Sequence, residues 1–316
     1  MTQFDTNKKQ TQRPLVAKLL LLLGITLLFM AVGSGIGLVL FEGMAGVPFA
    51  TFQLSPSSYP QAWYATMLLQ MLSTPLPFIG ASLFYWVIVE KQATTELSFR
   101  STDSHLLIVI ALLVVGFMPF DGLFIEWNKN IHLPESMKAL EAWMKASEDA
   151  AAELTKFLTA FDTPLRFGVG MLVVAVAAGV SEELLFRGVM QNLLLKAWKN
   201  PHWAIWVAAF WFSFIHFQFY GFIPRMLLGA MFGYLYHWTK NLWVSIFAHF
   251  INNGFTLFMV YLYQIKVTNT DIEKVEDVPV MGAITSFIIT VGILYWVYTF
   301  HRKENHTHNE RLEENL

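Results

Sequence analysis

The chain has 316 residues, of which 55% are hydrophobic and 14% are charged, and its mean hydropathy is +0.47. Soluble domains have an apolar share nearer ~45–50%, so this composition predicts a protein that lies in a lipid bilayer. The net charge of −2 offers no basic surface for nucleic acid, and the lack of cysteine excludes disulfides, thiolate catalysis and cysteine-ligated metals.

Apolar runs of the length that a membrane requires recur along the chain. A spanning helix needs roughly 20 mostly apolar residues, so we expect an all-α integral membrane bundle of about eight transmembrane helices. The fifth and sixth runs are short and adjacent, and they could instead form a re-entrant or tilted pair. The runs cover residues 15–40, 62–89, 105–124, 165–195, 203–217, 222–238, 242–263 and 280–300.

The loops between these runs predict the orientation. Lys and Arg gather before the first run, after the second, fourth and sixth, and after the last, whereas loop 41–61 has none. By the positive-inside rule both termini lie in the cytoplasm. The loop at 126–163 contains an amphipathic helix, which we expect either to cover a substrate path or simply to connect two spans at the membrane surface. The polar tail after residue 300 should be disordered.

Two smaller features concern packing. Pro75 and Pro77 should kink the second run, because proline cannot donate the helical hydrogen bond. Gly229 and Gly233, four residues apart, should let the sixth run pack closely against a neighbour.

An acidic pair stands inside the fourth run. Glu183 and Arg187 are four residues apart and share a helix face, while Glu182 points about 100° away. An ionisable group at membrane depth costs at least ~2.5 kcal/mol, so these groups call for a shared polar site. We expect Arg187 to neutralise Glu183 and leave Glu182 facing a cavity as a general base, although an ion pair at a span end is the structural alternative.

Two further motifs carry imidazole and amide groups. His249 and Asn253 share one face of the seventh run, and Asn252 should point elsewhere. His216 follows Phe212 by one turn at the end of the fifth run. His249 and Asn253 could stabilise an oxyanion, ligate a metal or only bond to a neighbouring helix. Three such segments in one apolar chain favour a common site.

The order Glu-Glu-x-x-x-Arg, Phe-x-x-x-His and His-x-x-x-Asn resembles the CPBP family of CaaX proteases and bacteriocin-processing enzymes, also called the Abi or type II CaaX prenyl endopeptidase family. The resemblance covers roughly residues 164–263. It implies that Glu182 activates the hydrolytic water with His216 assisting, and that His249 and Asn253 stabilise the oxyanion. Glu183 and Arg187, with Phe212, would support the motif. A zinc site formed by Glu182, His216 and His249 is the alternative; we favour a reaction without a cofactor, because Asn253 suits an oxyanion hole better.

The resemblance implies an intramembrane endopeptidase that cuts a membrane-associated protein or peptide. Alternatives are a membrane transporter or a non-catalytic immunity or scaffold protein that uses the same polar residues. We expect a bacterial plasma membrane. The chain then divides into a three-span region at 1–125, the amphipathic loop at 126–163, the catalytic core at 164–265, and the last span with its tail at 266–316.

Overall fold

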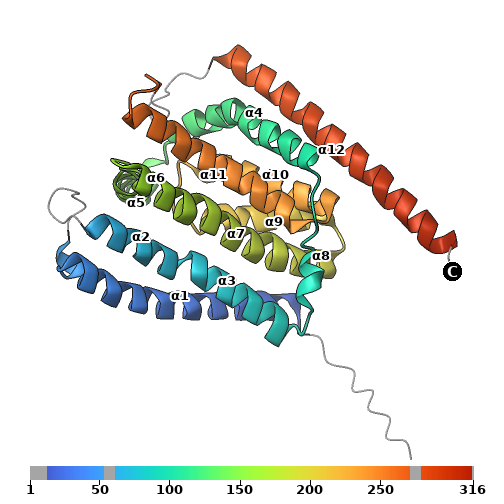
Figure 1. Ribbon diagram of the computed structural model, residues 1–316, viewed down its shortest axis with the longest axis horizontal. Coiled ribbons are helices and arrows are strands. Elements are labelled where there is room, and N and C mark those ends of the chain that lie inside the picture. The colour runs from blue at the N-terminus through green and yellow to red at the C-terminus, as the bar shows by residue number, and fades with distance from the viewer. Residues whose placement is uncertain (1–12, 53–60, 271–278, 315–316) are drawn as a thin grey trace, which may run out of the picture.

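The computed structural model describes residues 13–52, 61–270 and 279–314, and within these ranges it is all-α. Figure 1 shows the long helices lying side by side in one bundle, with α1 at one edge and α12 at the other. The described part of the chain has six helices long and apolar enough to cross a membrane. This confirms the predicted class.

The six candidate spans follow the predicted runs closely. They lie in α1 (Leu15–Ala45), α2 with α3 (Ala62–Ser73, Pro75–Leu83), α4 (Ser104–Lys129), the composite span Pro164–Trp198, α11 (Leu242–Gln264) and α12 (Val280–Glu314), whose candidate span ends at Arg302. Short helical turns occupy Phe49–Thr51, Thr94–Leu97 and Glu135–Met137. The expected kink lies between α2 and α3, where Thr74 leaves the helical conformation just before Pro75. A π-helical segment, Phe84–Val89, completes that span.

The remaining two predicted runs form α9 (Pro201–Phe214) and α10 (Phe222–Thr239). At 1.5 Å per residue, the 14 residues of α9 reach about 21 Å, less than the ~30 Å hydrocarbon core. The count of eight spans is therefore not confirmed. The two helices pack closely, since a Cβ on Gly229 would lie 3.0 Å from Phe212 and one on Gly233 would lie 2.9 Å from Ile205.

The composite span is irregular where the acidic pair lies. It begins with α6 (Pro164–Gly170) and ends with α8 (Asn192–Trp198). Between them, the six-residue helix α7 (Ala178–Glu183) is flanked by two π-helical segments, Met171–Ala177 and Leu184–Gln191. Such π segments are rare and frequently occur at functional sites. Glu182 and Glu183 are the last two residues of α7.

The amphipathic loop contains α5 (Lys138–Leu158). Phe157 and Phe161 are buried, and the indole nitrogen of Trp63 donates to the carbonyl oxygens of Phe157 and Leu158 at 3.1 and 3.2 Å. The C-terminal part of α5 is thereby fixed to α2. The predicted apolar face is only partly used, because Leu140 and Trp143, nearer its N-terminal end, remain exposed.

The expectation of a disordered tail is wrong for residues 301–314. These residues continue α12 to Glu314. The segment has neither glycine nor proline and contains several good helix formers, so nothing in its sequence ends the helix that begins in the apolar run.

Candidate active site

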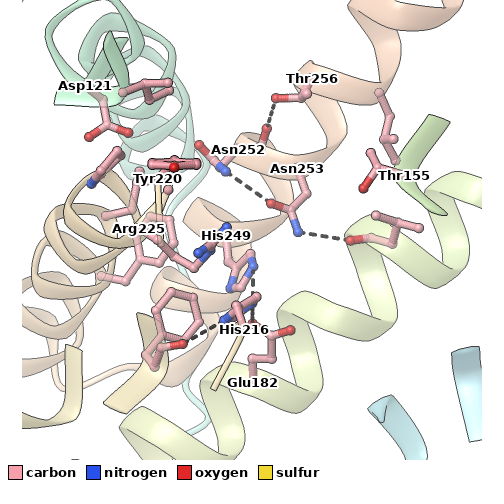
Figure 2. Close-up of a pocket in the computed structure, with 18 of the residues that line it drawn as sticks. Asp121, Thr155, Glu182, His216, Tyr220, Arg225, His249, Asn252, Asn253 and Thr256 are labelled. Carbon is pink, nitrogen blue, oxygen red and sulfur yellow. Dashed lines mark hydrogen bonds and ion pairs between the residues drawn. The ribbon is translucent and has the colours of Figure 1, made fainter. Parts of the chain in front are cut away.

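The four predicted catalytic residues and Phe212 line one cavity of about 520 Å³, shown in Figure 2. Its walls come from α4, α5, the composite span, α9 with the loop that follows it, α10 and α11. Apolar residues such as Leu228, Phe232 and Val260 form much of the lining. The charged and amide side chains that line it are Asp121, Glu148, Glu182, His216, Arg225, His249, Asn252 and Asn253.

Glu182 is the carboxylate that faces this cavity. Its Oε2 lies 3.9 Å from Nε2 of His216 and 4.0 Å from Nε2 of His249. Among the described residues no donor forms a direct hydrogen bond with it. Because 3.9 to 4.0 Å is too long for a hydrogen bond but short enough for one bridging water, the three groups can hold a water molecule between them.

The Nδ1 nitrogen of each imidazole has a hydrogen-bond partner in the protein. Nδ1 of His216 lies 2.8 Å from the carbonyl oxygen of Phe212, which can only accept a hydrogen bond, so Nδ1 carries the proton. Nδ1 of His249 lies 2.9 Å from Oε1 of Glu183 and donates to that carboxylate. The Nε2 of each ring is therefore the nitrogen that points toward Glu182, and the Nε2 of a neutral His216 is unprotonated.

Glu183 and Arg187 form the predicted ion pair. Nη1 of Arg187 donates to Oε1 of Glu183 at 2.6 Å, and Nη2 donates to the carbonyl oxygen of Gly229 at 2.7 Å. The side chains of Glu183 and Arg187 are 0% and 1% exposed. The guanidinium carbon also lies 4.6 Å from the ring centre of Phe212 and 5.6 Å from that of Phe232. Arg187 thus ties the composite span to α9 and α10.

Phe212 links the pieces of the site. Its ring contacts the rings of both His216 and His249, with centres 5.4 and 5.8 Å apart. Phe232 stacks on His249, with ring centres 5.4 Å apart. These aromatic contacts hold the two imidazoles in orientation, a role that the sequence indicated for Phe212 but not for Phe232.

Asn253 is held by two hydrogen bonds. Its Nδ2 donates to the carbonyl oxygen of Val174 at 3.0 Å, and its Oδ1 accepts from Nδ2 of Asn252 at 3.1 Å. One amide hydrogen of Asn253 is left for another acceptor. The expectation that Asn252 points elsewhere is wrong, since Asn252 also lines the cavity. Its bond to Asn253 turns it toward the same space.

The spacing of these groups bears on the zinc alternative. Two ligands of a tetrahedral zinc, each about 2.0–2.2 Å from the metal, lie about 3.3–3.5 Å apart. The separations of 3.9 and 4.0 Å from Glu182 to the two imidazoles exceed this by roughly 0.5 Å. No group of three or more acidic or imidazole side chains in the described chain is arranged to hold a metal. A zinc ion held by Glu182, His216 and His249 would therefore require these side chains to approach one another by about that amount.

Other polar lining residues escaped the sequence analysis. Asp121 on α4 and Arg225 on α10 are ionisable groups within apolar runs, which was the available signal. Glu148 on α5 accepts a long hydrogen bond of 3.4 Å from the backbone N–H of Tyr220. Thr155 of α5 lines the cavity too, so α5 covers one side of the cavity. The interpretation of this segment as a cover for the substrate path requires such a position.

Comparison with known proteins agrees with the motif analysis. Residues 164–255 match the model of the Rce1-like type II CAAX prenyl endopeptidase family. The predicted family resemblance is thereby confirmed over that segment, which contains all seven residues of the three motifs.

Two Bacillus subtilis proteins are similar in sequence. One, named "Uncharacterized protein YpbD", is 32% identical over 101 residues, covering 31% of this chain and 46% of its own length. The other, named "Putative membrane peptidase YdiL", is 28% identical over 89 residues, covering 28% of this chain and 36% of its own. The chain thus spans less than half the length of these relatives. No solved structure matches it.

Proposed function

We propose that this protein is an intramembrane endopeptidase that hydrolyses a peptide bond in a membrane-associated protein or peptide. The observation that carries the proposal is the position of Glu182, whose Oε2 faces Nε2 of both His216 and His249 across a cavity inside the helix bundle. The family match of residues 164–255 and the name of one relative support the same class of activity.

The attacking water would lie between Glu182 and His216. A water about 2.8 Å from both atoms spans their separation of 3.9 Å. It donates one hydrogen to each, so one of its lone pairs turns toward the cavity and the scissile carbonyl carbon. Glu182 takes a proton as the carbon–oxygen bond forms, and it later gives that proton to the departing amine nitrogen.

Asn253 and His249 would stabilise the oxyanion of the tetrahedral intermediate. Asn253 has a free amide hydrogen for this purpose, because Val174 uses only one of the two. His249 donates its Nδ1 hydrogen to Glu183, so it can serve an oxyanion only when Nε2 is protonated too. The carboxylate of Glu183 orients the imidazole toward this position, and Arg187 holds the carboxylate in place.

The arrangement of loops supports a plasma-membrane protein with both termini in the cytoplasm. Contacts join segments assigned to the cytoplasmic side: Lys18 with Glu90 at 2.6 Å, Lys196 with Glu96 at 3.7 Å, and Asn241 with the backbone of Arg100. On the opposite side α5 contacts Trp63 and Tyr220. The relatives from Bacillus subtilis agree with a bacterial source.

The test is Glu182→Gln in purified protein reconstituted into lipid vesicles with a pooled peptide library, with mass spectrometry of the products. The amide keeps the volume but cannot take a proton from water, so cleavage should fall about 100-fold or more while the melting temperature stays unchanged. Glu126→Gln, at an exposed position, is the control and should cleave normally. Cleavage by Glu182→Gln at the wild-type rate would remove Glu182 from the base role.

A further inference from the structure

Arg225 brings a guanidinium into the cavity without a full set of partners. Its Nη2 donates to Oε1 of Gln218 at 2.7 Å, but its buried Nη1 has no hydrogen-bond partner. It forms no ion pair with any carboxylate among the residues that the structure describes. The guanidinium lies against Gly221, where an added Cβ would stand only 3.1 Å from Nη2. Arg225 thus lines the cavity and has one buried guanidinium nitrogen without a partner among the described residues.

Asp121 supplies the complementary group. Its side chain is 6% exposed and lines the same cavity, and its buried Oδ1 has no hydrogen-bond partner in the described chain. Asp121 is one of the carboxyl groups that act electrostatically on Arg225, together with Glu148 and Glu182. In Figure 2 Asp121 lies at the opposite end of the lining from Glu182.

Arg225 has an unpaired donor and Asp121 an unpaired acceptor, and both residues line one cavity. A ligand that carries an acceptor for Arg225 and a donor for Asp121 would complete both. Leaving a buried polar group unsatisfied is costly, so the ligand should complete both groups at once. A free anion would satisfy Arg225 and face the carboxyl of Asp121, while a cation would do the reverse. A peptide backbone carries a carbonyl acceptor and an N–H donor, and it is neutral.

We propose that Arg225 and Asp121 form a subsite for the substrate backbone, at a distance from the scissile bond. Arg225 donates to a backbone carbonyl oxygen and Asp121 accepts from a backbone N–H. This inference rests on the proposed peptidase function and adds the way in which the substrate is held. Recognition through the backbone would leave the sequence of the substrate weakly restricted on this side of the cut.

The variants Arg225→Met and Asp121→Leu keep most of the side-chain volume but remove charge and hydrogen bonding. The probe is the peptide that the reconstituted wild-type protein cleaves fastest in the pooled library. Each variant should raise KM about tenfold with kcat within about twofold, and the double variant should raise KM by about the product. If the two groups instead only neutralise each other, the double variant will regain the wild-type KM, and the proposal is overturned.

A second series keeps both charges. Gly221→Ala places a methyl group against the guanidinium at a backbone φ of −97°, which alanine tolerates, so it should raise KM with the fold intact.

The same peptide is then N-methylated at one backbone nitrogen at a time. At one position methylation should raise KM for the wild type but not for Asp121→Leu, and the absence of any such position overturns the assignment of Asp121.

The two proposals fail in different ways. One outcome is that the wild-type protein cleaves a peptide while the variants and the methylated peptides give the same KM as the wild-type protein with the unmodified peptide. In that case the proposed subsite is wrong, and the proposed peptidase function is retained. If the wild-type protein cleaves none of the library, both proposals are overturned.

Discussion

Replacing Arg187 by alanine should destabilise the fold as well as inactivate the protein. The change removes a 2.6 Å ion pair to Glu183, a 2.7 Å hydrogen bond to Gly229 and the stacking on Phe212, all at 1% exposure. Removing one partner of such a buried pair costs about 3–5 kcal/mol, because the remaining charge stays buried without compensation. In a chain of this size the melting temperature should fall by roughly 5–8 °C.

The assay is thermal unfolding of purified protein in detergent at one fixed heating rate, since membrane proteins seldom unfold reversibly. Lys196→Ala is the matched control, because its pair with Glu96 is 3.7 Å long and half exposed and should contribute at most ~1 kcal/mol. A double variant, Glu183→Leu with Arg187→Met, should recover much of the lost stability. An unchanged melting temperature for Arg187→Ala would mean that the ion pair does not stabilise the fold, and the reasoning would fail.

Three further outcomes are expected. Asn253→Ala should lower kcat about 100-fold with little change in KM, and a change confined to KM would contradict the oxyanion role. Purified active protein should contain well under one zinc per chain and resist chelators; stoichiometric zinc whose removal and return switch activity off and on would contradict the metal-independent mechanism. The hydrogen bond from His132 lowers the pKa of Glu141, so its stabilising effect should be complete above about pH 5 and disappear as pH falls through the lowered pKa. His132→Ala should therefore differ from wild type in melting temperature near pH 6 but not near pH 2.

Local helix geometry explains which parts of the site the sequence could predict. Glu183 and Arg187 pair because residues four apart share a face, and Glu182 faces the cavity because it is one residue removed. The bond from His249 to Glu183 depends on how α11 is rotated against α7, which no spacing within either helix specifies. Asn252 was misplaced for the same reason, since α11 turns both amides toward the cavity.

The rest of the cavity depends on contacts between distant segments. Asp121 and Arg225 are 104 positions apart in the sequence, from 121 to 225, and each was a lone charge in an apolar run. A lone charge of this kind can mark the end of a span, make a packing contact or bind a ligand. These possibilities are distinguished only by the finding that both residues line the same cavity. Similarly, the apolar pattern of α9 and α10 indicated helices but not whether each crosses the bilayer.

The adjacent carboxylates illustrate how one short helix can serve two purposes at membrane depth. Glu183 is fully buried, and its Oε1 accepts from both Arg187 and His249, while its Oε2 has no hydrogen-bond partner among the described residues. Glu182 accepts no direct hydrogen bond in the described chain and meets the two imidazoles only at 3.9 and 4.0 Å. Of the two carboxylates, Glu182 is the one with room for a water molecule beside it, so it is the one placed to take a proton from that water. Because Glu183 orients His249 through its hydrogen bond, Glu183 also sets the position of one of the two imidazoles that Glu182 faces.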